Sequence, residues 1–193
     1  MGSKRVLVVW GQSSDGSYGA SLAAAYVDAA RQAGHTVRLL QLDQMQFDPI
    51  LHQGYRVVQP LEPDLLAAQA DILWAEHLTF VYPIWWGGLP ALLKGFLDRV
   101  LLPGFAYKFQ AGKSFQTKLL KGRSAHLLVT MDFPPWYFRW VYRAAGVHQM
   151  KASTLAFCGI RTTATLNMGP IVNSTPAQRS AWLRRVEKLA ASL

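Results

Sequence analysis

The stretch from Phe80 to Val100, which reads FVYPIWWGGLPALLKGFLDRV, decides the fold. It opens as an apolar run that predicts a buried β-strand, and Pro83 ends this strand because proline has no backbone donor. Gly87 and Gly88 permit a sharp turn, and Pro90 suits the first turn of a helix. The helix carries its leucines and its phenylalanine on one face, which predicts packing against a sheet.

Two tryptophans occupy the loop between this strand and this helix. Open α/β sheets place their ligands in loops at the carboxyl ends of their strands. Trp85 and Trp86 would present flat faces to a ring bound there. The alternative is a tryptophan pair packed in a core turn, since aromatic pairs are common in protein interiors. The pattern of residues alone leaves both interpretations open.

Outward from this stretch, the chain alternates apolar runs with amphipathic segments. The expected strands are Val6–Trp10, His35–Leu40, His77–Tyr82, Ala125–Thr130 and Ser153–Phe157. The expected helices are Ser17–Ala33, Pro63–Trp74, Pro90–Leu101, Pro135–Ala145 and Thr175–Ala191. Strands that alternate with helices predict a parallel sheet with right-handed crossovers. No linker or repeat interrupts the alternation, so we expect residues 1–193 to form a single domain.

The loop after the first strand has the composition of an anion site. Residues 11–19 combine serines, glycines and the start of a helix. Amide groups at a helix N-terminus stabilise an anion without any positive side chain. No Gly-x-Gly-x-x-Gly pattern is present, so the loop is not a dinucleotide fingerprint. A phosphate site and a simple polar cap of the helix both fit this sequence.

Composition limits the classes of protein to consider. The chain has 193 residues, of which 51% are hydrophobic, and this is enough for one three-layer core. Cys158 is the only cysteine, which excludes an internal disulfide and fits a reducing compartment. We expect it to be a small buried side chain. The apolar run near the N-terminus is too short for a signal peptide or a membrane span, so we expect a cytoplasmic protein.

Positive charge is concentrated in the second part of the chain. Residues 1–109 hold eight Lys/Arg and nine Asp/Glu, whereas residues 110–193 hold twelve and two, so the second part carries a net charge of +10. Such a surface attracts anionic ligands, acidic partners or an anionic membrane face. It is also compatible with a solvated basic face. No motif or spacing predicts specific nucleic-acid recognition, and none predicts a metal site.

Three segments together resemble a known family. Tyr82–Ala91, Leu93–Val100 and Gly104–Tyr107 are similar to the central motif of the flavodoxin-like NAD(P)H dehydrogenase (quinone) family, the DT-diaphorase group. A weaker resemblance extends through Phe47–Ile50 and Phe157–Ile160 to nearly the whole chain. It implies an α/β three-layer sandwich with a five-stranded parallel sheet of order 2-1-3-4-5. It also implies a bound FMN, with FAD as the alternative.

The resemblance places the flavin against three loops. The implied cofactor-binding residues are Gly11, Gln12, Ser17, Tyr18, Gly19, Pro83, Ile84, Trp85, Trp86, Thr130, Met131, Asp132 and Phe133. Among them, Ser17, Tyr18 and Gly19 would hold the flavin phosphate. A family histidine is replaced by Gly11 or Gln12, and the family's Thr-Thr-Gly-Gly reads Thr-Met-Asp-Phe here. We expect Asp132 to cap the following helix instead of facing the ring.

The resemblance further implies a two-electron, ping-pong transfer of hydride from NADH or NADPH through the flavin to a quinone-like acceptor. Tyr107 and Trp136 would line the substrate slot, and Tyr137 is the counterpart of a catalytic family tyrosine. A flavin-binding regulatory or partner-binding subunit without significant turnover is the alternative, and a one-electron carrier is a third interpretation. Family members pair as two-fold homodimers, which would bury the aromatic segments Leu101–Phe109 and Phe133–Tyr142.

Overall fold

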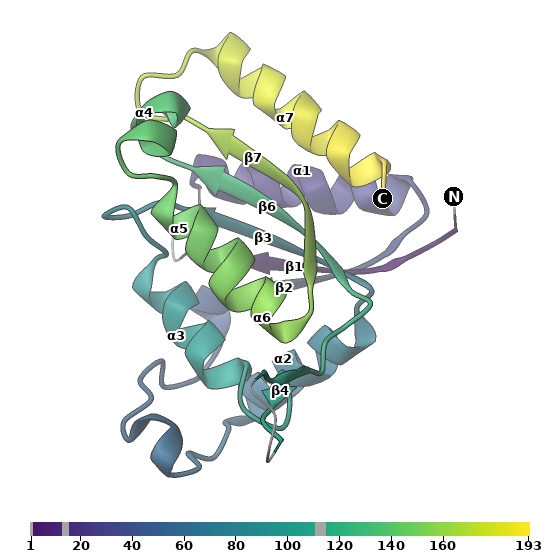
Figure 1. Cartoon of the computed structure of the whole chain (residues 1–193). Coiled ribbons are helices and arrows are strands. Elements are labelled where there is room, and N and C mark those ends of the chain that lie inside the picture. Colours follow the sequence, from purple (N-terminus) through teal and green to yellow (C-terminus); the bar gives the residue numbers. More distant parts are fainter. Residues whose placement is uncertain (1, 13–15, 111–114) are drawn as a thin grey trace.

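A computed structural model describes residues 2–12, 16–110 and 115–193 of the chain. Its centre is a five-stranded sheet, whose strands are drawn as arrows in Figure 1. The strands are β1 (Arg5–Trp10), β2 (Thr36–Gln41), β3 (His77–Pro83), β6 (Ser124–Thr130) and β7 (Arg161–Met168). They are all parallel, in the order β2-β1-β3-β6-β7. The predicted flavodoxin-like order 2-1-3-4-5 is therefore confirmed.

Helices cover both faces of the sheet and make it a three-layer sandwich (Figure 1). One face packs against α1 (Tyr18–Gln32) and α7 (Pro176–Ala191). The other packs against α2 (Pro63–Trp74), α3 (Ala91–Val100), α5 (Ala145–His148), the π-helix η3 (Gln149–Leu155) and α6 (Ala156–Cys158). Strand β1 supplies alternate residues to the two cores, with Val6 and Val8 on one side and Leu7 and Val9 on the other. This alternation is the two-residue period of a strand that is buried on both faces.

The fifth strand lies later in the chain than the sequence predicts. Ser153–Phe157, expected to be a strand, is helical and belongs to the run from α5 to α6, where Met150, Leu155 and Cys158 are buried. The actual strand, β7, contains three threonines and lies at the sheet edge, with most of its side chains partly exposed. An edge strand does not need the continuous apolar run that marks a central strand, which is why its sequence gave a weaker signal.

The long connections contain short elements of their own. These are η1 (Leu42–Gln44), η2 (Gly54–Arg56), β4 (Tyr107–Lys108), β5 (Thr117–Lys118) and α4 (Pro135–Trp140). Strands β4 and β5 pair in an antiparallel two-stranded sheet. Cys158 is buried as expected, and burial raises the pKa of its thiol to about 11. Within the ranges described above, no helix combines the length and the apolar character that a membrane span requires.

A buried arginine fixes the connection between β2 and α2. Arg99, at the end of α3, has a fully buried side chain. Its guanidinium donates to both carboxylate oxygens of Glu62, at 2.9 and 3.3 Å, and to the backbone oxygens of Pro60 and Asp48. One turn earlier, Gly95 lets Pro49 approach closely, because a Cβ there would lie 2.5 Å from the proline ring. The connection is therefore held against α3 at two successive turns.

Candidate functional site

Three loops meet at the carboxyl edge of the sheet and surround a cavity of about 150 Å³. They follow β1, β3 and β6, and a fourth segment after β7 closes one side. The lining residues are Gln12, Ser17, Tyr18, Gly19, Pro83, Ile84, Trp85, Thr130, Met131, Asp132 and Ile171. Ten of these are among the thirteen cofactor-binding residues that the resemblance implied. Ile171 is the lining residue that the sequence did not indicate.

The first of these loops leads into the N-terminus of α1. The hydroxyl oxygen of Ser17 caps the helix by accepting a hydrogen bond from the amide of Ala20 at 3.2 Å. The amides of Tyr18 and Gly19 lie in the first turn of α1, where backbone N–H groups have no acceptor within the helix. This turn carries no acidic side chain. Gly19 is required here because a Cβ would lie 2.4 Å from the ring of Trp10. The backbone at this point has the free amide donors that a phosphate needs.

The start of α7 adds a positive charge beside this helix N-terminus. The Arg179 guanidinium lies 5.5 Å from the ring centroid of Tyr18, and the Tyr18 hydroxyl donates to the Arg179 carbonyl at 2.7 Å. Burial raises the pKa of Tyr18, and the charge of Arg179 opposes that shift. Sequence reasoning missed Arg179. Its only sequence signal is the capping box of Thr175 and Gln178, which starts α7 at this same edge of the sheet.

The turn after β3 holds a tryptophan in an unusual backbone conformation. Trp85 and Gly88 exchange two backbone hydrogen bonds of 3.1 and 2.9 Å, and the central residues Trp86 and Gly87 have φ angles of 51° and 76°. Two positive φ angles define the tight hairpin turn that normally requires Asn or Gly at its first central position. A tryptophan in this position is strained, and such strain gathers at ligand clamps. The amide of Gly146 donates to the Gly87 carbonyl at 3.0 Å and fixes the turn from behind.

The loop after β6 is tied to the segment after β7. The amide of Met131 donates to the Met168 carbonyl at 3.0 Å, and the Ile171 amide donates to the Met131 carbonyl at 3.0 Å. Asp132 accepts a hydrogen bond from the Val172 amide at 3.1 Å. The prediction that Asp132 caps the next helix is therefore wrong: Pro134 stands at the cap position of α4, with no side-chain cap. The Asp132 carboxylate instead holds the segment after β7, which closes one side of the cavity.

Three of the implied residues do not line the cavity. Gly11 packs against the side chain of Leu93, Trp86 projects into solvent, and the Phe133 ring stacks on Tyr142 with centroids 5.3 Å apart. Tyr137, the candidate catalytic residue, belongs to the same ring cluster, 6.5 Å from Phe133. The cluster adjoins the tryptophan turn, because the Tyr142 ring lies against Gly87.

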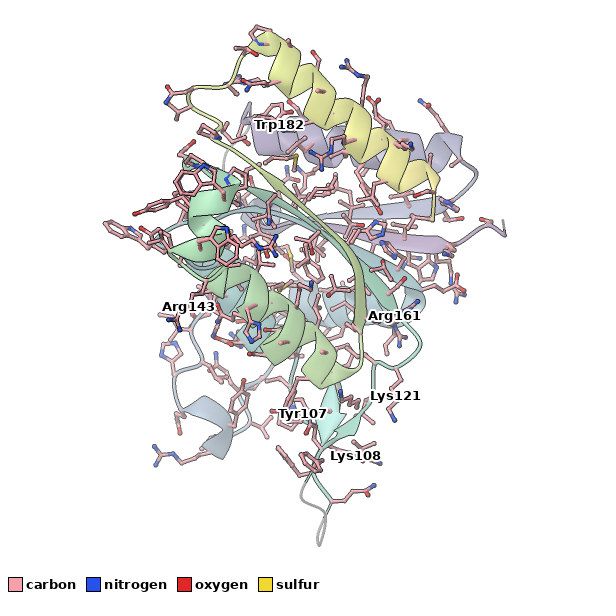
Figure 2. All side chains as sticks on the ribbon, turned by 45° about the horizontal axis from the view of Figure 1, so that its top comes forward. Tyr107, Lys108, Lys121, Arg143, Arg161 and Trp182 are labelled. Carbon is pink, nitrogen blue, oxygen red and sulfur yellow. The ribbon has the colours of Figure 1, made fainter. Side chains whose placement is uncertain are left out.

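The two expected slot residues lie apart from the cavity and from each other. Tyr107 belongs to β4, with its ring 4.9 Å from Phe157 and near Cys158 in a separate hollow. Figure 2 shows Tyr107 in the lower part of the molecule, near Lys108 and below Arg143. Trp136 lies on α4 and is 64% exposed, beside β7. Within one chain, therefore, the structure does not bring Tyr107 to the cavity.

The comparisons with known proteins agree with this geometry. The family model described as flavodoxin-like fold, Flavodoxin_2, matches residues 4–190. An uncharacterized NAD(P)H oxidoreductase of Haemophilus influenzae is 38% identical over 118 residues, which cover 60% of this chain and 57% of that protein. The ribosyldihydronicotinamide dehydrogenase [quinone] of Pongo abelii is 27% identical over 98% of this chain and 93% of its own length. The solved NAD(P)H:quinone oxidoreductase from Methanothermobacter marburgensis superposes with a TM-score of 0.83 at 24% identity, covering 98% of each chain. The chain belongs to the flavodoxin-like family that includes the NAD(P)H:quinone oxidoreductases.

Proposed function

We propose that the protein is a flavin-dependent oxidoreductase that takes hydride from NADH or NADPH and reduces quinones or related acceptors. The observation that carries this proposal is the convergence of three strand-end loops on one cavity, beside a helix N-terminus without acidic side chains. Open α/β sheets bind cofactors at this edge. The quinone-reducing relatives that match almost the whole chain support the choice of acceptor.

The residues around the cavity fit FMN, with FAD as the alternative. The amides of Tyr18 and Gly19, with Arg179 nearby, are the groups that would hold the phosphate. Trp85 would lie against the ring system of the flavin, and the backbone of Met131 would contact the flavin from the other side. A bound flavin supplies the hydride chemistry itself. The protein positions the rings and keeps water from the reacting face.

In this proposal the donor and the acceptor use one slot in turn, which gives ping-pong kinetics. The slot lies over the tryptophan turn, where the two hydrogen bonds between Trp85 and Gly88 hold the backbone in place. Tyr137 stands on α4 at the rim, in ring contact with Tyr142, which itself touches the turn. We propose its hydroxyl as the hydrogen-bond donor beside the ring, since a positioned donor stabilises charge that develops during transfer.

Steady-state turnover tests the function. The flavin-loaded protein should oxidise NADH or NADPH only when a soluble quinone is added, and the double-reciprocal plots for the two substrates should be parallel. Retention of flavin without turnover would favour the regulatory or partner-binding subunit. Build-up of a one-electron reduced flavin during titration would favour the electron carrier.

A two-fold homodimer completes the proposed site. Tyr107 is half-buried, and Phe109 beside it is exposed, although both rings lie far from the cavity of their own chain. Exposed aromatic side chains gathered at one place mark an interface or a ligand site. We propose that Tyr107 and Phe109 of each chain line the slot of its partner, so that the acceptor site lies at the boundary between the two chains.

Mixing two variants tests this arrangement. Trp86→Ala and Tyr107→Ala should each lower quinone reduction alone, because every site in either homodimer lacks one ring. Mixed dimers contain one site with both defects and one site with neither, so activity should recover after subunit exchange. A monomer by light scattering at micromolar concentration, with full activity, would contradict the proposal.

Flavin retention should differ between variants of Trp86 and Trp136, two of the exposed tryptophans. We expect Trp86→Ala to weaken flavin binding by about 1 to 3 kcal/mol, and by more than Trp136→Ala, because only Trp86 belongs to the turn beside the cavity. Trp86→Asn is the matched control for backbone strain, since asparagine tolerates a positive φ. It should lose as much flavin affinity as the alanine variant. Equal retention in Trp86→Ala and Trp136→Ala would show that the ring is placed wrongly.

A further inference from the structure

A groove runs along the outer edge of the sheet, between β7 and the segment from α4 to α6. It consists of two hollows, of about 510 and 480 Å³, that share Ala144, Val147 and Lys151 as lining residues. Figure 2 shows Arg143 and Arg161, which both line the second hollow, toward the two ends of the α5–α6 helical run. The groove is distinct from the flavin cavity, with which it shares no lining residue.

Unpaired positive charge is the main property of this groove. Its cationic lining residues are Arg139, Arg143, Lys151 and Arg161, and no aspartate or glutamate lines either hollow. Within residues 2–12, 16–110 and 115–193, none of the four is placed in an ion pair or donates a side-chain hydrogen bond to the protein. Cations that face a concave surface without partners attract an anionic ligand.

The groove also offers aromatic faces and unused polar atoms. Trp136 and Trp140 line it and are 64% and 72% exposed, and the Arg139 guanidinium lies 5.5 Å from the Trp140 ring centroid. On the opposite wall, Thr165 Oγ1 and Asn167 Oδ1 are buried atoms for which the described part of the chain provides no hydrogen-bond partner. A flat base can stack on an exposed indole.

The groove begins next to the flavin cavity. Asp132 lines the cavity and Pro135, three residues later, lines the groove. Ring contacts run from Trp136 to Tyr137 at 5.8 Å and from Tyr137 to Phe133 at 6.5 Å, and Phe133 follows Asp132 in the chain. A single extended dinucleotide could therefore place one end at the cavity and the other in the groove.

We propose that this groove binds the adenosine end of the electron donor and selects the form with a 2′-phosphate, NADPH over NADH. The inference rests on the proposed function, because it needs the nicotinamide at the flavin. In Rossmann-type folds, sites for NADH use a carboxylate on the ribose 2′-hydroxyl and sites for NADPH use a basic side chain, and the same charge complementarity applies to any 2′-phosphate site. This groove has basic side chains and no carboxylate. Lys151 lines both hollows, which makes it the central candidate for the phosphate.

Direct binding tests the groove without catalysis. Calorimetry with the FMN-loaded protein should show adenosine 2′,5′-bisphosphate binding at least about tenfold more tightly than AMP, because it carries the additional phosphate. Lys151→Gln should lower the affinity for the bisphosphate about ten- to hundredfold, and Lys151→Arg should keep most of the wild-type affinity. Lys188→Gln is the charge-matched control, since Lys188 lies between α1 and α7 on the opposite face of the sheet.

Flavin reduction kinetics then separate this inference from the proposed function. The ratio of kcat/KM for NADPH to that for NADH should exceed tenfold in the wild type and fall toward one in Lys151→Gln. Two results would overturn the assignment of the groove without affecting the proposed oxidoreductase function. One is equal use of both donors by all variants, and the other is bisphosphate binding that Lys188→Gln weakens as much as Lys151→Gln. Loss of all NAD(P)H oxidation in the wild type would instead refute the proposed function. Binding of anionic vesicles that depends on Trp140, with no nucleotide binding, would overturn the inference in favour of a membrane surface.

Discussion

Replacing Arg99 with alanine should lower the free energy of unfolding by about 3 to 5 kcal/mol, the range for breaking a buried charge pair. The guanidinium is fully buried and donates to the Glu62 carboxylate and to the carbonyls of Pro60 and Asp48. Its removal leaves these acceptors without their donor and opens a cavity beneath α3. Although partial burial raises the pKa of Glu62, hydrogen bonds from Asp48 and Arg99 lower it overall, which agrees with a stabilised carboxylate.

A second ion pair on the same helix provides the control. Lys94 donates to both oxygens of Asp98 at 2.8 and 2.6 Å, but both side chains are partly exposed. Lys94→Ala should therefore cost less than about 1 kcal/mol, as exposed pairs do. Urea unfolding at neutral pH measures both variants. If Arg99→Ala cost no more than Lys94→Ala, the anchoring role of Arg99 would be refuted.

Stability should fall steeply between pH 7 and pH 5 because two buried histidines are held neutral. His77 and His126 have rings 4.3 Å apart, and both approach the Tyr26 hydroxyl, at 3.3 and 2.8 Å. Burial lowers the pKa of His77 to about 2, with smaller contributions from His126, Lys4 and His35, and lowers that of His126 to about 4. In the unfolded chain both titrate near the ordinary value of about 6.5.

The sign of the effect follows from proton uptake on unfolding. Below pH 6.5 the unfolded state binds two protons that the folded state excludes, so acid favours unfolding. Each histidine should cost roughly 2 kcal/mol between pH 7 and pH 5. The double variant His77→Gln/His126→Asn keeps polar atoms near the Tyr26 hydroxyl and should show a much flatter dependence. A wild-type protein of equal stability at both pH values would contradict the assignment.

The central strands were predictable because they are short apolar runs between clear helix and turn signals, whereas the order of the sheet came from the family resemblance. β3 begins at His77 as predicted and ends at Pro83, one residue after the predicted end at Tyr82. The cavity-lining loops were predictable for the same reason, since the carboxyl ends of parallel strands meet at one edge. The family resemblance then indicated which residues of these loops would bind a flavin.

What the sequence did not reveal depends on contacts between distant segments. Asp132 bonds to Val172, forty residues later, so its local position before Pro134 and Pro135 suggested a helix cap that does not form. Arg99 reads as the exposed end of an amphipathic helix, and only the path of residues 47–62 over α3 shows that it is buried. β7 was missed because an edge strand tolerates threonines. The place of Tyr107 in a site requires a second chain, which the proposed homodimer supplies.

Flavin binding tests the central claim most directly. The purified protein should be incubated with excess FMN, freed of unbound cofactor by gel filtration and examined by visible absorption. We expect the wild type to retain about one flavin per chain and to bleach when NADH or NADPH is added without oxygen, because the cofactor carries the chemistry. A wild-type protein that retains neither FMN nor FAD would contradict the account.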